Sequence, residues 1–171
     1  MSKKILALIE EGYEDLELLY PVIRLREEGY QVDIAGPEEG KTYSGKHGYP
    51  YKSDVSFKKI SAENYDGLVV PGGWAPDKLR RYQEVTDIIL SMNRRNKPVA
   101  TICHAGWVLV TANALQGRKV TSVNVIRPEM EFAGAKWLDQ SVVVDGNYVS
   151  SRTPADLPDY MKALIKLLKE I

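Results

Sequence analysis

The chain has 171 residues and carries 23 Lys and Arg against 23 Asp and Glu, so its formal net charge is zero. This length predicts one compact domain over residues 1–171, and the balanced charge gives no overall field that attracts nucleic acid or an anionic membrane. The single cysteine, Cys103, excludes an intrachain disulfide and a small secreted fold built on disulfides. Because no apolar run approaches the roughly 18 residues of a membrane span, we expect a soluble, cytoplasmic protein.

Short β-rich runs alternate with helical patterns along the first half of the chain. The runs that predict strands here are 5–9, 30–35 and 67–70. The spacing of apolar residues over 15–28 predicts a helix, inside which Pro21 predicts a kink or a restart. The segment 41–53, rich in Gly, Tyr and Lys, predicts a peripheral hairpin or loop.

The same alternation continues to the end of the chain. The segments that predict strands are 98–102, 120–122, 142–144 and 148–150. Those that predict helices are 77–96, 104–115, 128–133 and a C-terminal amphipathic helix ending at Ile171. Asp145-Gly146-Asn147 predicts a tight hairpin between the last two strands. The apolar stripe of the last helix is most simply core packing.

Strand–helix alternation of this kind implies a parallel sheet between two layers of helices, joined by right-handed crossovers. We therefore expect a flavodoxin-like, three-layer α/β/α sandwich with a mostly parallel central sheet. Ligands of such folds bind at the carboxyl ends of the strands. Three loops follow central strands and are predicted to meet at that edge, namely 10–17, 71–77 and 103–106.

The loop at Cys103 carries the strongest chemical signal. The predicted strand runs directly into Cys103, and Ala105-Gly106 keep the next turn small. This spacing fits a strand–nucleophile–helix turn that exposes a nucleophile, and it fits equally a buried cysteine at the end of a strand. In the first interpretation the helix N-terminus favours the thiolate and predicts a lowered thiol pKa. The adjacent His104 is then placed to accept the thiol proton.

The other two loops add candidate groups around Cys103. Gly72 and Gly73 suit any tight turn after a strand, but their backbone N–H groups, with that of His104, also predict an oxyanion hole. The acidic loop fits a solvated helix N-terminus, and its convergence with Cys103 makes Glu14 a candidate site residue.

Metal and cofactor signatures are absent from the sequence. One Cys and two His, His47 and His104, provide no zinc spacing. No strand is followed by G-x-G-x-x-G, and there is no P-loop. We therefore expect no metal and no cofactor.

Five segments together resemble a known family. They are Glu-Asp-Leu-Glu at 14–17, Gly-Lys-His-Gly-Tyr at 45–49, Val-Val-Pro-Gly-Gly at 69–73, Ile-Cys-His at 102–104 and Val-Asp-Gly-Asn-Tyr-Val-Ser-Ser-Arg at 144–152. With them the chain resembles, over nearly its whole length, the PfpI-type intracellular protease branch of the ThiJ/PfpI superfamily, relatives of the class I glutamine amidotransferases. Members are described as intracellular cysteine peptidases, protein deglycases or cofactor-independent glyoxalases.

The resemblance implies roles for individual residues. It implies Cys103 as nucleophile with His104 as its partner. It also implies that Glu14 lies against the sulfur, where the pKa of its carboxyl is raised and its proton hydrogen-bonds to the thiolate. In peptidase-type members an acidic residue after the Gly-Gly loop reaches the histidine of a neighbouring subunit, which implies a homo-oligomer with the site near the subunit interface. The matching residue is Asp77, where the family usually has Glu, and Val123 replaces a tyrosine common near the family's site.

Three functions compete on this basis. The first is a hydrolytic enzyme in which the Cys103 thiolate attacks the carbonyl of a peptide, a 2-oxoaldehyde or a glycated amine. The second is a non-catalytic stress or redox sensor in which Cys103 is oxidised. The third is an amidotransferase-like domain that serves a partner synthase. The lack of an additional domain counts against this third function. The first is our prediction, and the sequence does not choose between peptidase and deglycase or glyoxalase activity.

Overall fold

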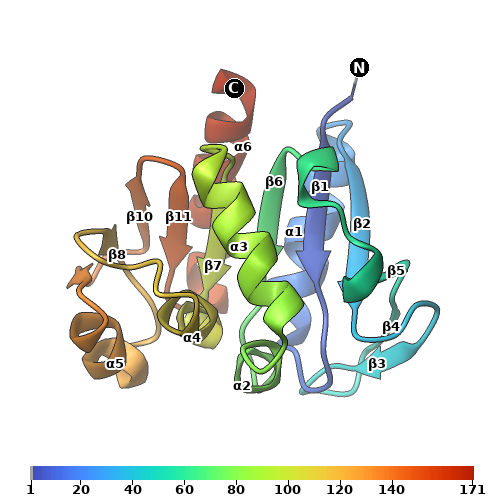
Figure 1. The fold of residues 1–171 in the computed structure, drawn as a ribbon, viewed down its shortest axis with the longest axis horizontal. Helices are drawn as coiled ribbons and strands as arrows, with labels where there is room; N and C mark the ends of the chain where they lie inside the picture. Colours follow the sequence, from blue (N-terminus) through green and yellow to red (C-terminus); the bar gives the residue numbers. More distant parts are fainter. Residues whose placement is uncertain (1) are drawn as a thin grey trace.

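Seven strands form the central sheet in the computed structural model, which describes residues 2–171 (Figure 1). Their order across the sheet is β10-β11-β7-β6-β1-β2-β5. The strands are β1 (Lys4–Leu8), β2 (Gln31–Gly36), β5 (Val55–Ser56), β6 (Gly67–Val70), β7 (Val99–Ile102), β10 (Val142–Asp145) and β11 (Tyr148–Ser151). Only the edge strand β10 is antiparallel to its neighbour. The mostly parallel sheet predicted from the sequence is therefore confirmed.

Helices cover both faces of this sheet (Figure 1). Helices α1 (Asp15–Glu27) and α6 (Leu157–Glu170) pack together on one face, and α3 (Gln83–Arg94) packs against β6 and β7 on the other. The shorter helices are α2 (Ala75–Leu79), α4 (Gly106–Thr111) and α5 (Arg127–Phe132). The result is the predicted three-layer α/β/α sandwich.

Two small strand pairs lie outside the main sheet. The pair β3 (Thr42–Ser44) and β4 (Pro50–Lys52) is antiparallel and forms the hairpin that the sequence predicts. The pair β8 (Lys119–Val120) and β9 (Lys136–Trp137) is parallel. The turn at Gly146 joins β10 to β11 as predicted.

The core follows the apolar patterns of the sequence. Residues 5–8 of β1 and all of β6 and β7 are buried, because helices cover these strands on both sides. The apolar stripe of α6 is buried from Leu157 to Leu168, whereas the terminal Ile171 is exposed. Among residues 2–171 no helix combines the length and the hydropathy that crossing a bilayer requires.

One predicted helix is divided in the structure. The segment 77–96 forms part of α2 and then α3, with Tyr82 between them in an extended conformation. The Tyr82 hydroxyl donates a hydrogen bond of 2.8 Å to the buried Glu10 carboxylate, at the end of β1. The break between α2 and α3 therefore coincides with a tertiary hydrogen bond, and no Gly or Pro in the sequence indicates it.

Two other helix predictions differ in detail. The segment 104–115 begins as a short 3₁₀ turn and ends as α4 at Thr111, shortly before Asn113 takes a left-handed φ of 52°. Helix α1 runs continuously through Pro21 and does not restart there. These differences leave the carboxyl edge of the sheet where the sequence predicts it.

Candidate active site

The loops after β1 and β6 meet directly at the carboxyl edge of the sheet, at the lower end of the molecule in Figure 1. Tyr13 and Gly73 form an isolated β-bridge. The Trp74 N–H donates to the Gly12 carbonyl at 2.8 Å, and the Glu14 N–H donates to the Gly72 carbonyl at 3.1 Å. The predicted convergence of these loops is present in the structure.

Cys103 follows β7 in a strained turn at the same edge. Its φ of 60° is left-handed, which is unusual for a residue with a side chain and costs roughly 1–3 kcal/mol. Its side chain is partly exposed. The structure thus has the sharp strand–turn–helix geometry typical of an exposed nucleophile, rather than an ordinary buried cysteine at the end of a strand.

Glu17 is the carboxyl that lies against Cys103. It is fully buried on the first turn of α1, and its Oε2 accepts the Gly72 N–H at 2.8 Å. A Cβ on Gly72 would collide with this oxygen and would lie 2.6 Å from the Cys103 Cβ, so only glycine lets the two side chains approach. Oε1 of Glu17 is buried without a hydrogen-bond partner among residues 2–171. The carboxyl and the thiol are nevertheless close enough for each to shift the pKa of the other.

The placement of Glu14 against the sulfur is therefore wrong. Glu14 is the N-cap of α1, and its Oε2 accepts the Glu17 N–H at 2.9 Å. Its Oε1 lies 3.6 Å from Nε2 of His47. Glu14 still lines the cavity at Cys103, but capping the helix turns its carboxylate away from the thiol and leaves that place to Glu17, three residues later.

The electrostatics of this pair also correct a prediction. Burial, with a smaller contribution from Glu14, raises the pKa of Glu17 from 4.5 to about 8. Burial and the neighbouring Glu17 raise the pKa of Cys103 to about 12, against the lowering expected from a helix N-terminus. The backbone N–H groups of His104 and Gly73 act in the opposite direction, and they are the donors that face the sulfur. Gly72 does not belong to the predicted oxyanion hole, because its N–H is bound to Glu17.

His104 is adjacent to the thiol in space as well as in sequence. Its Nδ1 lies 3.3 Å from Sγ of Cys103, and its ring packs 5.1 Å from that of Trp107. Burial and the charge of Lys46 lower its pKa below the ordinary 6.5. His104 is therefore neutral at neutral pH and able to exchange a proton through Nδ1.

Asp77 lies near His104 but does not bind it. Its carboxylate forms ion pairs with Arg80 at 3.1 Å and Arg81 at 2.6 Å. These contacts and the charges of both arginines hold the pKa of Asp77 below its usual value. Asp77 and His104 line the same cavity, with no hydrogen bond between them among residues 2–171. The pairing of Asp77 with a neighbouring subunit stays a prediction.

Two adjacent cavities open at this edge. The smaller, of about 220 Å³, is lined by Glu14, Glu17, Lys46, His47, Gly73, Trp74, Cys103, His104 and Pro154. The larger, of about 350 Å³, is lined by Gly73, Trp74, Asp77, Lys78, Arg81, His104 and Trp107. Because Gly73, Trp74 and His104 line both, a small chamber at the thiol adjoins a wider chamber at these three residues.

One cluster in residues 2–171 has the side chains to hold a metal ion. Ligand atoms of Glu14, Asp15 and His47 lie within 4.8 Å of one another. Both Asp15 oxygens, however, already accept backbone N–H groups, from His47 at 2.8 Å and Tyr49 at 2.9 Å. In this arrangement Asp15 fixes the β3–β4 loop to the start of α1.

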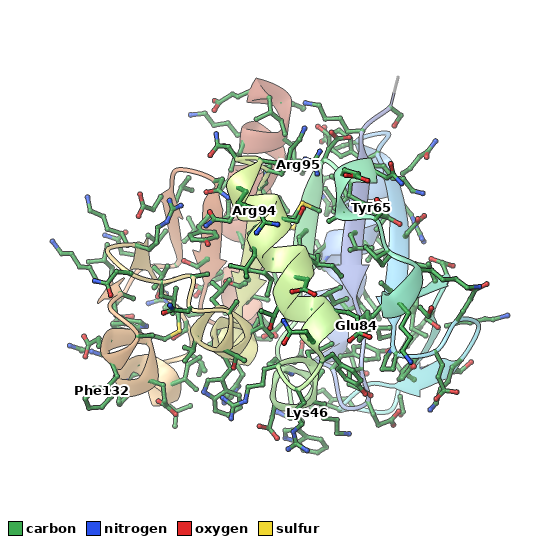
Figure 2. The ribbon with its side chains drawn as sticks, viewed as in Figure 1. Lys46, Tyr65, Glu84, Arg94, Arg95 and Phe132 are labelled. Atoms are coloured by element: carbon green, nitrogen blue, oxygen red, sulfur yellow. The ribbon has the colours of Figure 1, made fainter. Side chains whose placement is uncertain are left out.

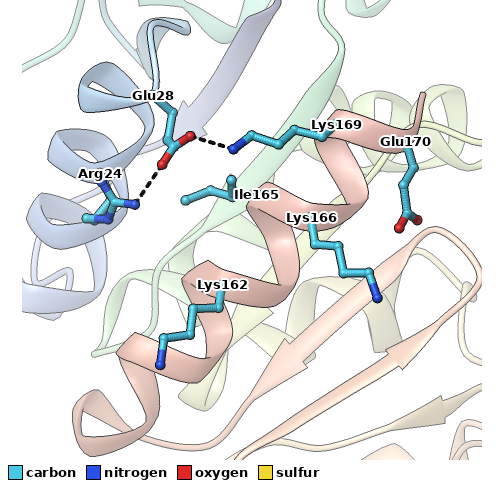
Figure 3. A pocket seen from close by; sticks show the side chains of 7 residues that line it. All are labelled: Arg24, Glu28, Lys162, Ile165, Lys166, Lys169 and Glu170. Atoms are coloured by element: carbon cyan, nitrogen blue, oxygen red, sulfur yellow. Dashed lines mark hydrogen bonds and ion pairs between the residues drawn. The ribbon is translucent and has the colours of Figure 1, made fainter.

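A groove of about 380 Å³ lies far from Cys103, between α1 and α6 (Figure 3). Glu28 lies within it between two cations, accepting from Arg24 at 3.0 Å and from Lys169 at 2.8 Å. These pairs connect the two helices at the surface. The groove contributes no group to the site at Cys103.

Replacing Glu17 with Gln tests its protonation. The folded-state pKa of Glu17, about 8, lies above its ordinary 4.5, so the unfolded chain releases a proton that the folded protein retains, and stability falls as pH rises through this interval. From about pH 5 to about pH 8 we expect wild type to lose about 3 kcal/mol relative to Glu17→Gln. Urea unfolding at both pH values measures this difference. Glu14→Gln is the matched control, and a Glu17→Gln difference independent of pH would contradict the buried, protonated carboxyl.

Comparisons with known proteins agree with this geometry. The family model described as "DJ-1/PfpI family" matches residues 3–167. The "Deglycase PfpI" of Pyrococcus furiosus is 48% identical over 166 residues, covering 97% of this chain and 99% of the relative. The "Putative cysteine protease YraA" of Bacillus subtilis is 38% identical over 169 residues, covering 99% of this chain and 100% of the relative.

Solved structures give the same result. A two-domain protein of Anabaena variabilis with DJ-1/ThiJ/PfpI-like and ferritin-like domains matches with a TM-score of 0.96 and 35% identity, over 98% of this chain and 48% of that one. The DJ-1beta structure of Drosophila melanogaster matches with a TM-score of 0.90 and 26% identity, over 99% of this chain and 90% of that one. Both the sequence relatives and the fold therefore point to a single family.

Proposed function

From membership of the DJ-1/PfpI family, to which this chain belongs, we propose that the protein is a cysteine-dependent hydrolase that acts on small carbonyl or glycated substrates. The observation that carries the proposal is the pairing of Cys103, in a strained turn, with the buried carboxyl of Glu17. The names of the relatives support the reaction class, since they include a deglycase and a putative cysteine protease.

The thiol and the carboxyl titrate as a coupled pair. When the pair loses its first proton, the remaining proton lies either on sulfur or on Glu17. In the reactive form it resides on the Glu17 carboxyl and is donated to the Cys103 thiolate, which the N–H groups of Gly73 and His104 also stabilise. The carboxyl thus supplies a hydrogen bond to a thiolate that is largely shielded from water.

Reaction with a 2-oxoaldehyde then needs no external oxidant. The thiolate adds to the aldehyde carbon, forming a C–S bond, and the resulting oxyanion takes up a proton to give a hemithioacetal. Transfer of hydrogen from that carbon to the adjacent ketone carbon, as a proton through an enediol, oxidises the first carbon and reduces the second. Water hydrolyses the thioester that results, releasing a 2-hydroxy acid and the thiol. His104, through Nδ1 at 3.3 Å from sulfur, is placed to move these protons.

The dimensions of the site favour a small reacting group. The chamber at Cys103, about 220 Å³, accepts a few heavy atoms beside the thiol. The adjoining wider chamber offers room for the amine or side chain that carries the glycated group.

Assaying three substrate types side by side tests the proposal. Wild-type protein freed of contaminating proteases is offered methylglyoxal, a methylglyoxal-modified amino acid and a casein peptide. We expect turnover of the first two, with 2-hydroxy acid as product, to exceed cleavage of the peptide. Stoichiometric oxidation of Cys103 with no turnover of any substrate would overturn the proposal and favour the redox-sensor function.

A further inference from the structure

The loop between β3 and β4 is held firmly over the Cys103 chamber. Its Lys46 N–H donates to the Tyr13 carbonyl at 2.7 Å, while the buried Asp15 accepts two further backbone N–H groups from the loop. A Cβ on Gly45 would lie 2.5 Å from an Asp15 oxygen, so the loop is pressed against the start of α1. The backbone of Lys46 therefore has a fixed position relative to the thiol.

The side chain of Lys46 is exposed on this loop and borders the site. It lines the Cys103 chamber, and Figure 2 shows it at the lower edge of the molecule. Its Nζ lies 5.9 Å from the centre of the Trp74 ring. Among residues 2–171 no carboxylate lies within ion-pair distance of this ammonium group. The charge of Lys46 nevertheless acts on the site, since it contributes to lowering the pKa of His104.

The other charges that border the chamber are already engaged. One Glu14 oxygen accepts the Glu17 N–H and the other faces His47. Glu17 shares its proton with Cys103, as described above. Among residues 2–171, Lys46 is thus a charged group of the chamber that forms no ion pair, although its charge acts on Glu17 and His104. An ammonium group in that position is suited to bind an anion.

We propose that Lys46 is a specificity-determining residue that binds a carboxylate of the substrate, so that the preferred substrates are carbonyl compounds that carry a carboxylate near the carbon attacked by Cys103. This inference rests on the proposed function. It adds a substrate class to that function. A pocket without a positive charge would not distinguish methylglyoxal from its anionic analogues, whereas Lys46 favours the anionic ones. Lys46 positions the substrate and takes no part in proton transfer.

Two alkylating reagents that differ mainly in charge provide the test. Iodoacetate and iodoacetamide each form a C–S bond with the Cys103 thiolate and release iodide, and mass spectrometry gives the rate constant for each. We expect the ratio of the iodoacetate to the iodoacetamide rate constant to fall about tenfold in Lys46→Met, as loss of one charge at short range implies. Lys46→Arg keeps the charge and is expected to retain the ratio.

Lys52→Met is the matched control. Lys52 is an exposed lysine of the same hairpin that lines neither chamber, so its removal changes the net charge equally and is expected to leave the ratio unchanged. The inference is overturned if the ratio in Lys46→Met equals that of wild type, or if Lys52→Met lowers the ratio as much as Lys46→Met does. The proposed function stands in either case. Failure of both reagents to modify Cys103 in wild type overturns the proposed function, and this inference with it.

Turnover gives an independent readout. The 2-oxoaldehyde 4,5-dioxopentanoate carries a carboxylate, and with one water it yields 2-hydroxyglutarate, just as methylglyoxal yields lactate. We expect Lys46→Met to raise KM for 4,5-dioxopentanoate with little change in KM for methylglyoxal. An equal change in KM for both substrates contradicts a role in anion binding.

Discussion

Replacing Cys103 with Ala is expected to lower kcat/KM for methylglyoxal at least about a thousandfold, because no other group in the chamber can form the hemithioacetal and the thioester. The same variant is expected to remain folded. The side chain is small and partly exposed, and the change to Ala removes only its sulfur, so we expect stability to change by about 1 kcal/mol. Steady-state kinetics and urea unfolding measure the two effects on one preparation.

Cys103→Ser provides the second variant for this prediction. It retains a hydroxyl in the strained turn but replaces a thiolate by a group that stays protonated at neutral pH, so we expect it to be nearly as inactive as Cys103→Ala. Activity of either variant close to that of wild type would show that another residue performs the attack.

Glu17→Gln is expected to lower kcat/KM about a hundredfold, which is the size of effect typical of a positioned proton donor or acceptor. The amide keeps an oxygen for the Gly72 N–H, so the backbone arrangement at the site is preserved. It cannot share a proton with the thiol, and the pH profile of kcat/KM is therefore expected to lose the titration of the coupled pair. Kinetics measured across the pH range in which the variant stays folded test both effects.

Glu14→Gln is the comparison that separates the two carboxyls. Glu14 caps α1 and lies toward His47, so we expect its amide variant to retain activity within about threefold and to lose at most about 1 kcal/mol of stability. A larger loss of activity in Glu14→Gln than in Glu17→Gln would contradict the assignment of Glu17 as the partner of the thiol.

The positions of the central strands, and their burial on both faces, follow closely from the sequence for a physical reason. Strands covered on both faces need continuous apolar runs, and β1, β6 and β7 carry such runs, each followed by a loop at the carboxyl edge. The sharp turn at Cys103 likewise follows from a predicted strand that runs directly into it, whereas its left-handed φ of 60° does not. These features depend on local sequence and on the general rules of parallel sheets.

The choice between Glu14 and Glu17 depends on information of another kind. The two carboxyls are one helical turn apart, and which of them caps the helix is decided by the extended conformation of Glu14 at the N-cap. The signal that could have identified Glu17 is the Glu-x-x-Glu spacing at a helix start, in which the first carboxylate binds the N–H of the second and leaves the second side chain free to face inward. The position of Gly72 beside that side chain then fixes the approach to sulfur.

The thiol pKa and the break at Tyr82 were equally inaccessible to local patterns. The sequence suggests a helix N-terminus that lowers the pKa of Cys103, but burial beside a carboxyl outweighs it. Tyr82 interrupts a continuous helical pattern where its hydroxyl bonds to Glu10, 72 positions earlier in the chain. Effects of this kind arise from residues that only the folded chain brings together.

Rapid-quench mass spectrometry of Cys103 during turnover of methylglyoxal tests the central claim most directly. The proposed chemistry predicts that, before the steady state, the peptide containing Cys103 gains the mass of one methylglyoxal, and that the adduct disappears as lactate forms. Glu17→Gln is expected to slow formation of the adduct without moving it to another residue. Lactate production with Cys103 unmodified throughout, or with the adduct on a different side chain, would contradict the claim that Cys103 is the nucleophile.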